Sequence, residues 1–154
     1  MKLEKEAVMQ ALEKAVRGTF ENTLFLDFEK AVEINTPGFK MKDQLTYIKI
    51  RSPYFGKLYL VINYDLAFDL IKALYNEIDY NAMMLLVDEI MAEICNTVTG
   101  RFLADIVPSN IEFEFSLPVC TKIAKEIDIQ NFDTDTFALK FIHQDNAVYC
   151  IYKN

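Results

Sequence analysis

Hydrophobic residues in this chain are grouped into blocks that each keep one periodicity, and this grouping limits the possible fold. Apolar residues recur every three or four positions from residue 4 to about residue 23, which predicts an amphipathic helix. Segments rich in β-branched and aromatic residues follow at 31–34, 45–50 and 58–62, with proline and glycine between them. Strands in runs joined by short turns favour an α+β fold, because parallel α/β sheets alternate each strand with a helix.

The sequence then returns to helical patterns before its second run of strands. Residues 65–74 predict a helix for which Asn63 or Asp65 is a suitable N-terminal cap, and a longer helix is expected over about 81–104. Residues 111–117 alternate apolar and polar side chains without a break. This alternation predicts a half-buried strand with one face in water.

Two further strands are expected at 137–143 and 147–152, and the polar residues 144–146 between them are typical of a tight hairpin. The acidic stretch 126–135 is interpreted as a surface loop with at most a short strand, because it lacks the glycine and terminal glutamate of a calcium-binding loop. The overall order indicates two related α-β-β-β halves, although no repeat is visible residue by residue.

Size and composition favour a single hydrophobic core, and the net charge argues against nucleic acid and anionic membranes as partners. The 154 residues suit a single domain over 1–154, and 52% of them are apolar, including 12 Phe and 8 Tyr. The formal net charge of −7 opposes binding to nucleic acid or to an anionic membrane, since both need a concentrated cationic surface. Protein or small-molecule partners are therefore favoured.

The cysteines and the hydropathy predict a cytoplasmic location. Cys95, Cys120 and Cys150 have neither CxxC spacing nor an even number, which argues against a disulfide framework or a zinc site and indicates a reducing compartment. No segment approaches the ~20 apolar residues needed to span a bilayer. The start of the chain contains acidic residues and lacks the apolar core of a secretory signal.

The long helix over 81–104 has two distinct faces. At about 100° per residue, four residues fall within roughly 60° of one another, and large apolar residues cluster nearly opposite them. The first set is Glu89, Glu93, Asn96 and Gly100, and the second is Val87, Met91, Ile94 and Val98. One face is expected to pack, whereas the other presents a carboxylate and a carboxamide side by side, where they can pair with a cation and hold a water.

Glu93-x-x-Asn96 followed by Gly100 resembles the motif of the CheX/CheC/FliY phosphatases of bacterial chemotaxis. The order of elements, the amphipathic first helix around 15–23 and the segment Ser116-Leu117-Pro118 extend the resemblance, which is to CheX over nearly the whole chain. The resemblance implies a CheC/CheX-like α+β fold, in which two α-β-β-β halves form a sheet with long helices packed on one face. A second copy of the motif on the first helix, as in CheC-like proteins, is absent.

The resemblance also implies a function, which is hydrolysis of the aspartyl phosphate of a phosphorylated CheY-like response regulator. Asn96 would orient the attacking water, and Glu93 would pair with the regulator's active-site lysine. The regulator would bring Mg2+, so no cofactor bound by this chain is expected. Because an amide is a poor base, no shifted pKa or covalent intermediate is required of this chain. Related proteins also imply a homodimer formed through sheet edges, for which the aromatic segment 149–152 is a candidate.

Several readings stay open at this stage. Glu89 stands where the family commonly has Asp or Ser, so it is either an auxiliary site residue or an ordinary exposed one. Gly100 either admits a partner's backbone or relieves packing between the helices, and Arg101 follows it in place of a small polar residue. His143 and Cys95 are interpreted as structural. The alternative function is a non-catalytic module for binding a response regulator or for dimerisation.

Overall fold

The computed structural model describes residues 3–75 and 79–154. The expectation that the start of the chain is not a secretory signal includes residues 1–2, which lie outside the described residues. The described residues form the helices α1 (Lys5–Leu24), α2 (Tyr64–Leu74) and α3 (Tyr80–Ile106), the strands β1 (Lys30–Glu33), β2 (Gln44–Ser52), β3 (Gly56–Ile62), β4 (Glu114–Phe115), β5 (Val119–Lys122), β6 (Thr136–His143) and β7 (Asn146–Lys153), and the 3-10 turns η1 (Ile123–Lys125) and η2 (Asp128–Gln130).

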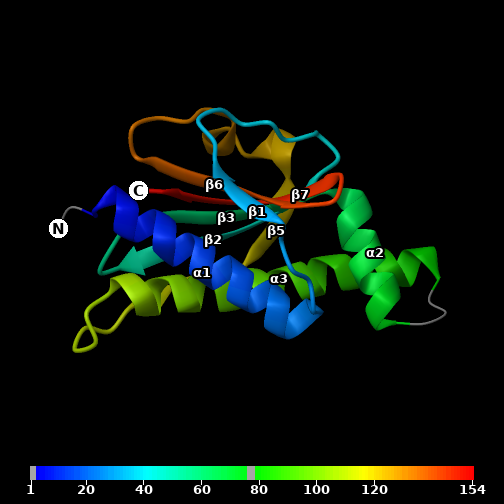
Figure 1. Ribbon diagram of the computed structural model, residues 1–154, viewed down its shortest axis with the longest axis horizontal. Helices are drawn as coiled ribbons and strands as arrows, with labels where there is room; N and C mark the ends of the chain where they lie inside the picture. The colour runs from blue at the N-terminus through cyan, green and yellow to red at the C-terminus, as the bar shows by residue number, and fades with distance from the viewer. Residues whose placement is uncertain (1–2, 76–78) are drawn as a thin grey trace.

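The strands form one antiparallel sheet with the long helices on one of its faces. The strand order is β1-β6-β7-β3-β2-β4, and β5 pairs with β2 on the same side as β4. Figure 1 shows α1 and α3 side by side below the sheet, where α1 packs on β6 and α3 on β2. The expected α+β arrangement is confirmed. In the described part of the chain, no helix is both long and apolar enough to cross a membrane.

The two expected halves are present, and each lends its first strand to the other. The hairpins β2–β3 and β6–β7 meet at the centre of the sheet through β3 and β7, with Leu58 opposite Tyr152. β1 pairs with β6 of the second half, whereas β5 pairs with β2 of the first half. The halves are therefore interlocked rather than placed side by side.

Apolar side chains bury both faces of the sheet. On the helix side, ring centroids lie 5.2 Å apart between Phe20 and Phe28 and also between Phe102 and Tyr152. On the opposite face, a smaller cluster around Tyr59 and Ile129 is covered by the segments 34–39 and 123–132. This second layer was not expected from the sequence, because it is formed by loops that have no regular periodicity.

The predicted strand 111–117 is wrong over most of its length. Regular pairing is limited to β4, and the pairing along β2 is interrupted where the Ser116 hydroxyl accepts a hydrogen bond of 2.9 Å from the Lys49 amide and Leu117 is 85% exposed. Pro118 has no N–H for the ladder. Pairing resumes in β5, a strand that the sequence analysis missed.

The acidic stretch 126–135 is a loop, as expected, and contains η2 and no strand. Two smaller expectations are corrected. Asn63 occupies the N-cap position of α2, but its side chain does not cap the helix and instead bonds Asp43 and the Ala147 amide. The aromatic segment 149–152 lies in β7 at the centre of the sheet and is buried, so it is not available as a sheet edge for a dimer.

Candidate functional site

The candidate site lies on α3, whose buried side is anchored along its whole length. The helix begins where the Asp79 carboxylate accepts a hydrogen bond of 2.8 Å from the Ala82 amide, a typical N-cap. Its 27 residues span about 40 Å. The predicted packing face is confirmed, since Val87, Met91, Ile94 and Val98 are all buried.

The opposite side of α3 presents the predicted polar residues to solvent. Glu89, Glu93 and Asn96 are exposed, and Gly100 is partly exposed. The structure therefore brings these residues together on one helix face, as expected from helical spacing. Within the described residues, neither the Glu93 carboxylate nor the Asn96 carboxamide has a hydrogen-bond or ion-pair partner. Both groups are available to an incoming molecule.

Gly100 is not required by packing between the helices. A Cβ atom placed on Gly100 would meet no atom within 4 Å, whereas one placed on Gly18 of α1 would lie 2.6 Å from Arg101 Nη1. The explanation of Gly100 as a relief for helix packing is therefore excluded. The helix is left with a flat, open surface one turn beyond Asn96.

An apolar hollow adjoins the two glutamates. It has a volume of about 350 Å³ and lies between α3 and the C-terminal ends of α1 and α2. Glu89 and Glu93 line it together with Thr23, Leu24, Leu74, Tyr75, Leu86, Ile90 and Ile94. Thr23, in the last turn of α1, and Tyr75, directly after α2, were not expected from the sequence, because no local pattern relates them to α3.

Leu85 extends the exposed face by one more turn. It lies four residues before Glu89 and is 70% exposed. Extending the i, i+4 spacing backward from Glu89 would have identified it. Leu85 therefore adds exposed apolar area to this face of α3.

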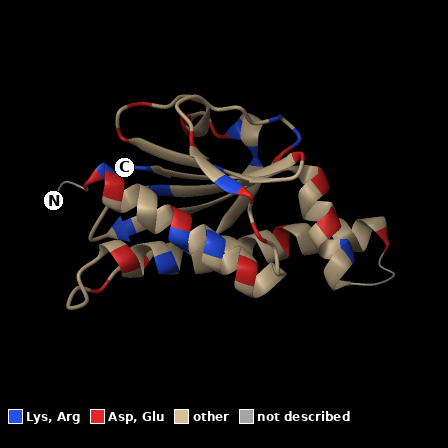
Figure 2. Cartoon of the chain, in the orientation of Figure 1, with Lys and Arg blue, Asp and Glu red and all other residues tan. Residues whose placement is uncertain are grey.

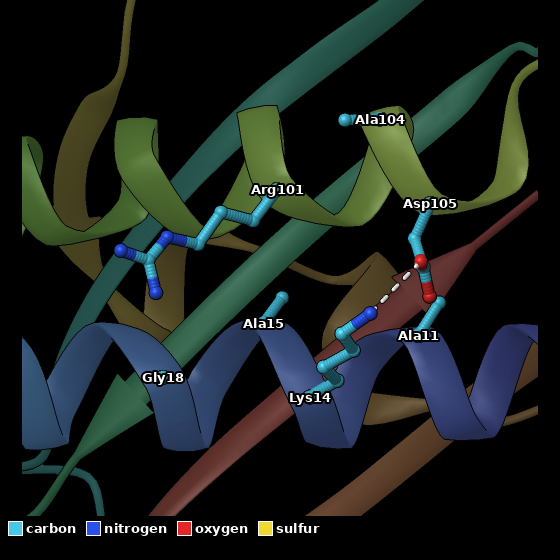
Figure 3. A pocket seen from close by; sticks show the side chains of 7 residues that line it. All are labelled: Ala11, Lys14, Ala15, Gly18, Arg101, Ala104 and Asp105. Carbon is cyan, nitrogen blue, oxygen red and sulfur yellow. Dashed lines mark hydrogen bonds and ion pairs between the residues drawn. The ribbon is translucent and has the colours of Figure 1, made fainter. Parts of the chain in front are cut away.

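A second hollow of about 350 Å³ lies between α1 and α3, further toward the end of α3. Figure 3 shows its lining, in which small residues of α1 face Arg101, Ala104 and Asp105 of α3. Lys14 Nζ lies 3.4 Å from Asp105 Oδ1. Figure 2 shows acidic and basic residues interspersed along α1, whereas α3 carries mainly acidic residues and one basic residue, Arg101.

Cys95 and His143, which the sequence analysis interprets as structural, have surroundings that fit this interpretation. Cys95 is fully buried, and burial raises the pKa of its thiol to about 12, which keeps it protonated and unreactive. His143 Nδ1 lies 3.0 Å from the Asp27 carbonyl oxygen. The described residues contain no group of three or more His, Cys, Asp or Glu side chains able to hold a metal ion.

The segment Ser116–Pro118 lies at the edge of the sheet, on β2, rather than beside the motif. The interactions of Ser116 are with Lys49 and with the Leu117 carbonyl oxygen. β5, which follows, approaches α3 on the other side of the helix, where Cys120 Sγ lies 3.4 Å from the Asp88 carbonyl oxygen. This segment therefore shapes the sheet edge and is not part of the exposed face of α3.

The sequence matches no family model and no curated protein. Solved structures do resemble the chain, and one is a chain of the CheX–CheY–BeF3–Mg2+ complex from Borrelia burgdorferi, with 12% identity and a TM-score of 0.74 over 98% of this chain and 97% of that one. A putative chemotaxis protein from Desulfovibrio vulgaris Hildenborough has 14% identity and a TM-score of 0.72 over 94% of each chain. A CheC-like superfamily protein from a Shewanella species has 14% identity and a TM-score of 0.69 over 100% of each chain.

These likenesses establish the fold of the chain along its whole described length. It is the fold of the CheC/CheX class of chemotaxis proteins, which confirms the fold expected from the resemblance. CheX from Vibrio vulnificus has this fold too, and it aligns with 95% of this chain at 14% identity and a TM-score of 0.69.

Proposed function

We propose that residues 1–154 act as one CheX-like domain, a cytoplasmic phosphatase that hydrolyses the aspartyl phosphate of a CheY-like response regulator. The observation that carries this proposal is the pair Glu93 and Asn96 on the long helix of a CheX-type fold. Both are exposed, and their side chains have no partner among the residues that the structure describes. The partner class is supported by the similar chain from Borrelia burgdorferi, which was crystallised with CheY, BeF3 and Mg2+.

Hydrolysis of an aspartyl phosphate requires few catalytic groups from this chain. An aspartyl phosphate has a good leaving group, so catalysis consists mainly of placing a water in line with the phosphorus atom. In the proposed complex, the Asn96 carboxamide accepts a hydrogen bond from that water and orients its lone pair. The water oxygen bonds to phosphorus as the P–O bond to the regulator's aspartate breaks. The aspartate leaves as a carboxylate, and both protons of the water stay on the inorganic phosphate that forms. The regulator supplies the magnesium ion.

Glu93 fixes the register of the two proteins in this proposal. Its carboxylate pairs with the regulator's active-site lysine, and the 3-residue spacing then sets Asn96 over the phosphoryl group. Glu89 lies in the same hollow as Glu93 and supports the negative charge of this end of the site. Gly100 lets the partner's backbone approach α3, since the space at its Cα is open.

Phosphate release from a phosphorylated regulator in the presence of magnesium tests this proposal. We expect native protein to accelerate release and Asn96→Ala to lower kcat by roughly 100-fold, because the water loses its orientation. Glu93→Ala should raise KM by about 10-fold, because an interfacial charge pair is lost. Asn110→Ala removes an exposed carboxamide from the loop before β4 and serves as the control.

The same experiment separates the phosphatase from the alternative function. The apolar hollow and the exposed Leu85 favour docking of a regulator whether or not hydrolysis follows. If the native protein binds a BeF3-loaded regulator but leaves the decay of the phosphorylated form unchanged, the phosphatase proposal is wrong. The chain is then a regulator-binding module. Full turnover in Asn96→Ala would refute the water-positioning role alone.

We also propose that the chain forms a homodimer through a sheet edge. The ends of the sheet are β1 and the β4–β5 side of β2. The β4–β5 edge is the more apolar of the two, because Leu117 is 85% and Val119 is 42% exposed there. Unpaired edge strands that carry apolar side chains are suited to pairing with a second copy.

A further inference from the structure

Arg101 is a cation that lies next to the proposed site and has no partner in the part of the chain that the structure describes. Of the chain's arginines, Arg17 bonds Glu13 and the Phe28 carbonyl oxygen, and Arg51 lies 3.6 Å from Glu114. Within the described residues, Arg101 has neither a hydrogen-bond nor an ion-pair partner, although its side chain is exposed at the α1–α3 groove. The other cation of that groove, Lys14, is paired with Asp105.

The side chain of Arg101 lies in the groove between α1 and α3. Figure 3 shows the guanidinium directed along α3 away from Asp105, toward the preceding turns of the helix, and it lies over Gly18 of α1. Helical side chains generally lean toward the helix N-terminus, so this direction follows from the backbone. The cation is therefore presented in the groove, on the flank of α3 that faces α1 and next to the face that carries the motif.

Gly18 makes room for this position of the guanidinium. A Cβ atom on Gly18 would lie 2.6 Å from Arg101 Nη1, and the next contact would be 3.9 Å from Arg101 Cζ. No other atom lies within 4 Å of that Cβ. Glycine inside a helix is less stable than alanine, so Gly18 lowers the stability of α1, and its missing side chain leaves the space that the guanidinium occupies.

We propose that Arg101 binds a carboxylate on the surface of the response regulator and thereby sets its orientation on α3. This inference rests on the proposed function. α3 carries negative charge at Glu89 and Glu93 in one hollow and positive charge at Arg101 in the neighbouring groove, so a complementary partner that covers both presents a cation and an anion in the same order. A guanidinium matches a carboxylate with two parallel hydrogen bonds, which fixes direction as well as distance.

Arg101→Ala, measured for both turnover and affinity, tests the proposal. We expect KM for the phosphorylated regulator and Kd for the BeF3-loaded regulator to rise by roughly 10-fold, with kcat unchanged and with weaker dependence on salt. Arg101→Lys should restore part of the affinity, since it retains charge but not the two-pronged geometry. Arg51→Ala removes the same charge from β2 and should change neither value.

Gly18→Ala provides an independent perturbation that keeps the charge. The added methyl group displaces the end of a flexible side chain, so the melting temperature should not fall, but affinity should weaken. In an Arg101→Ala background, Gly18→Ala should have no further effect on Kd. An equal effect of Gly18→Ala with and without Arg101 would overturn the coupling.

The possible failures are distinguishable. If Arg101→Ala keeps native KM and Kd while Asn96→Ala loses turnover, the proposed function stands and the role of Arg101 is refuted. If Arg101→Ala lowers kcat without changing Kd, the guanidinium acts on the phosphoryl group and the carboxylate proposal is wrong. If native protein neither binds nor dephosphorylates the regulators, both proposals are overturned.

Discussion

Gly100 combines a local cost in stability with an open surface, and both follow from its missing side chain. Because its Cβ position is empty for 4 Å, Gly100→Ala should raise the free energy of unfolding by about 0.5–1 kcal/mol through helix propensity alone. The same methyl group would stand where a partner's backbone approaches α3, so the Kd for a BeF3-loaded regulator should increase. Urea unfolding and titration of the regulator measure the two effects.

A stabilised Gly100→Ala protein with native affinity would show that Gly100 has no role in docking.

At the scale of residues, the placement of Glu93 beside Asn96 on an exposed helix face was predictable from the sequence, because helical geometry relates residues that are close in sequence. Thr23 and Tyr75 were not predictable, because only tertiary packing brings the ends of α1 and α2 to α3.

Among the elements, the edge formed by β4 and β5 gives the sharpest test of self-association. We expect the native protein to have the mass of a dimer in solution by light scattering. Val119→Lys should shift it toward the monomer, because a charge on the edge opposes strand pairing. Val32→Lys introduces the same charge on β1, where Val32 is 40% exposed, and should leave the dimer intact.

A native monomer, or dissociation by Val32→Lys alone, would contradict this choice of edge. The helices and the central strands were predicted well, because their periodicity extends over many residues. The strands at the β4–β5 edge were not predicted correctly. Alternation of apolar and polar residues over 111–117 does not show how many of these residues have a neighbouring strand to pair with. The interruption at Ser116–Pro118 depends on a hydrogen bond to Lys49, more than sixty residues away in the chain.

At the scale of the whole molecule, the burial of cysteine thiols and tyrosine hydroxyls in the core predicts that the folded state loses stability at alkaline pH. Burial raises the pKa of Cys95 and that of Tyr152 to about 12, and it raises the pKa values of Cys150 and Tyr59. Unfolded thiols and phenols ionise at about pH 8.5 and 10. The unfolded chain therefore releases protons that the folded chain retains, and the free energy of unfolding should decrease from about pH 8.5 toward 12.

Urea unfolding at intervals from neutral to alkaline pH measures this dependence. Cys95→Ala serves as the comparison, since it removes one buried thiol, and its free energy of unfolding should fall less steeply with pH even if its value at neutral pH is lower. An unfolding free energy of the native protein that stays constant up to about pH 11 would contradict the prediction.

The exchange of first strands between the two halves determines when this sheet can be completed during translation. α1 depends on local contacts and can form early, whereas Lys30 of β1 has Ile142 as its partner. β3, likewise, needs β7. The ribosome must therefore deliver nearly the whole chain before either long-range pairing closes. Until then, β1 and β3 present unpaired backbone groups to chaperones and to neighbouring nascent chains.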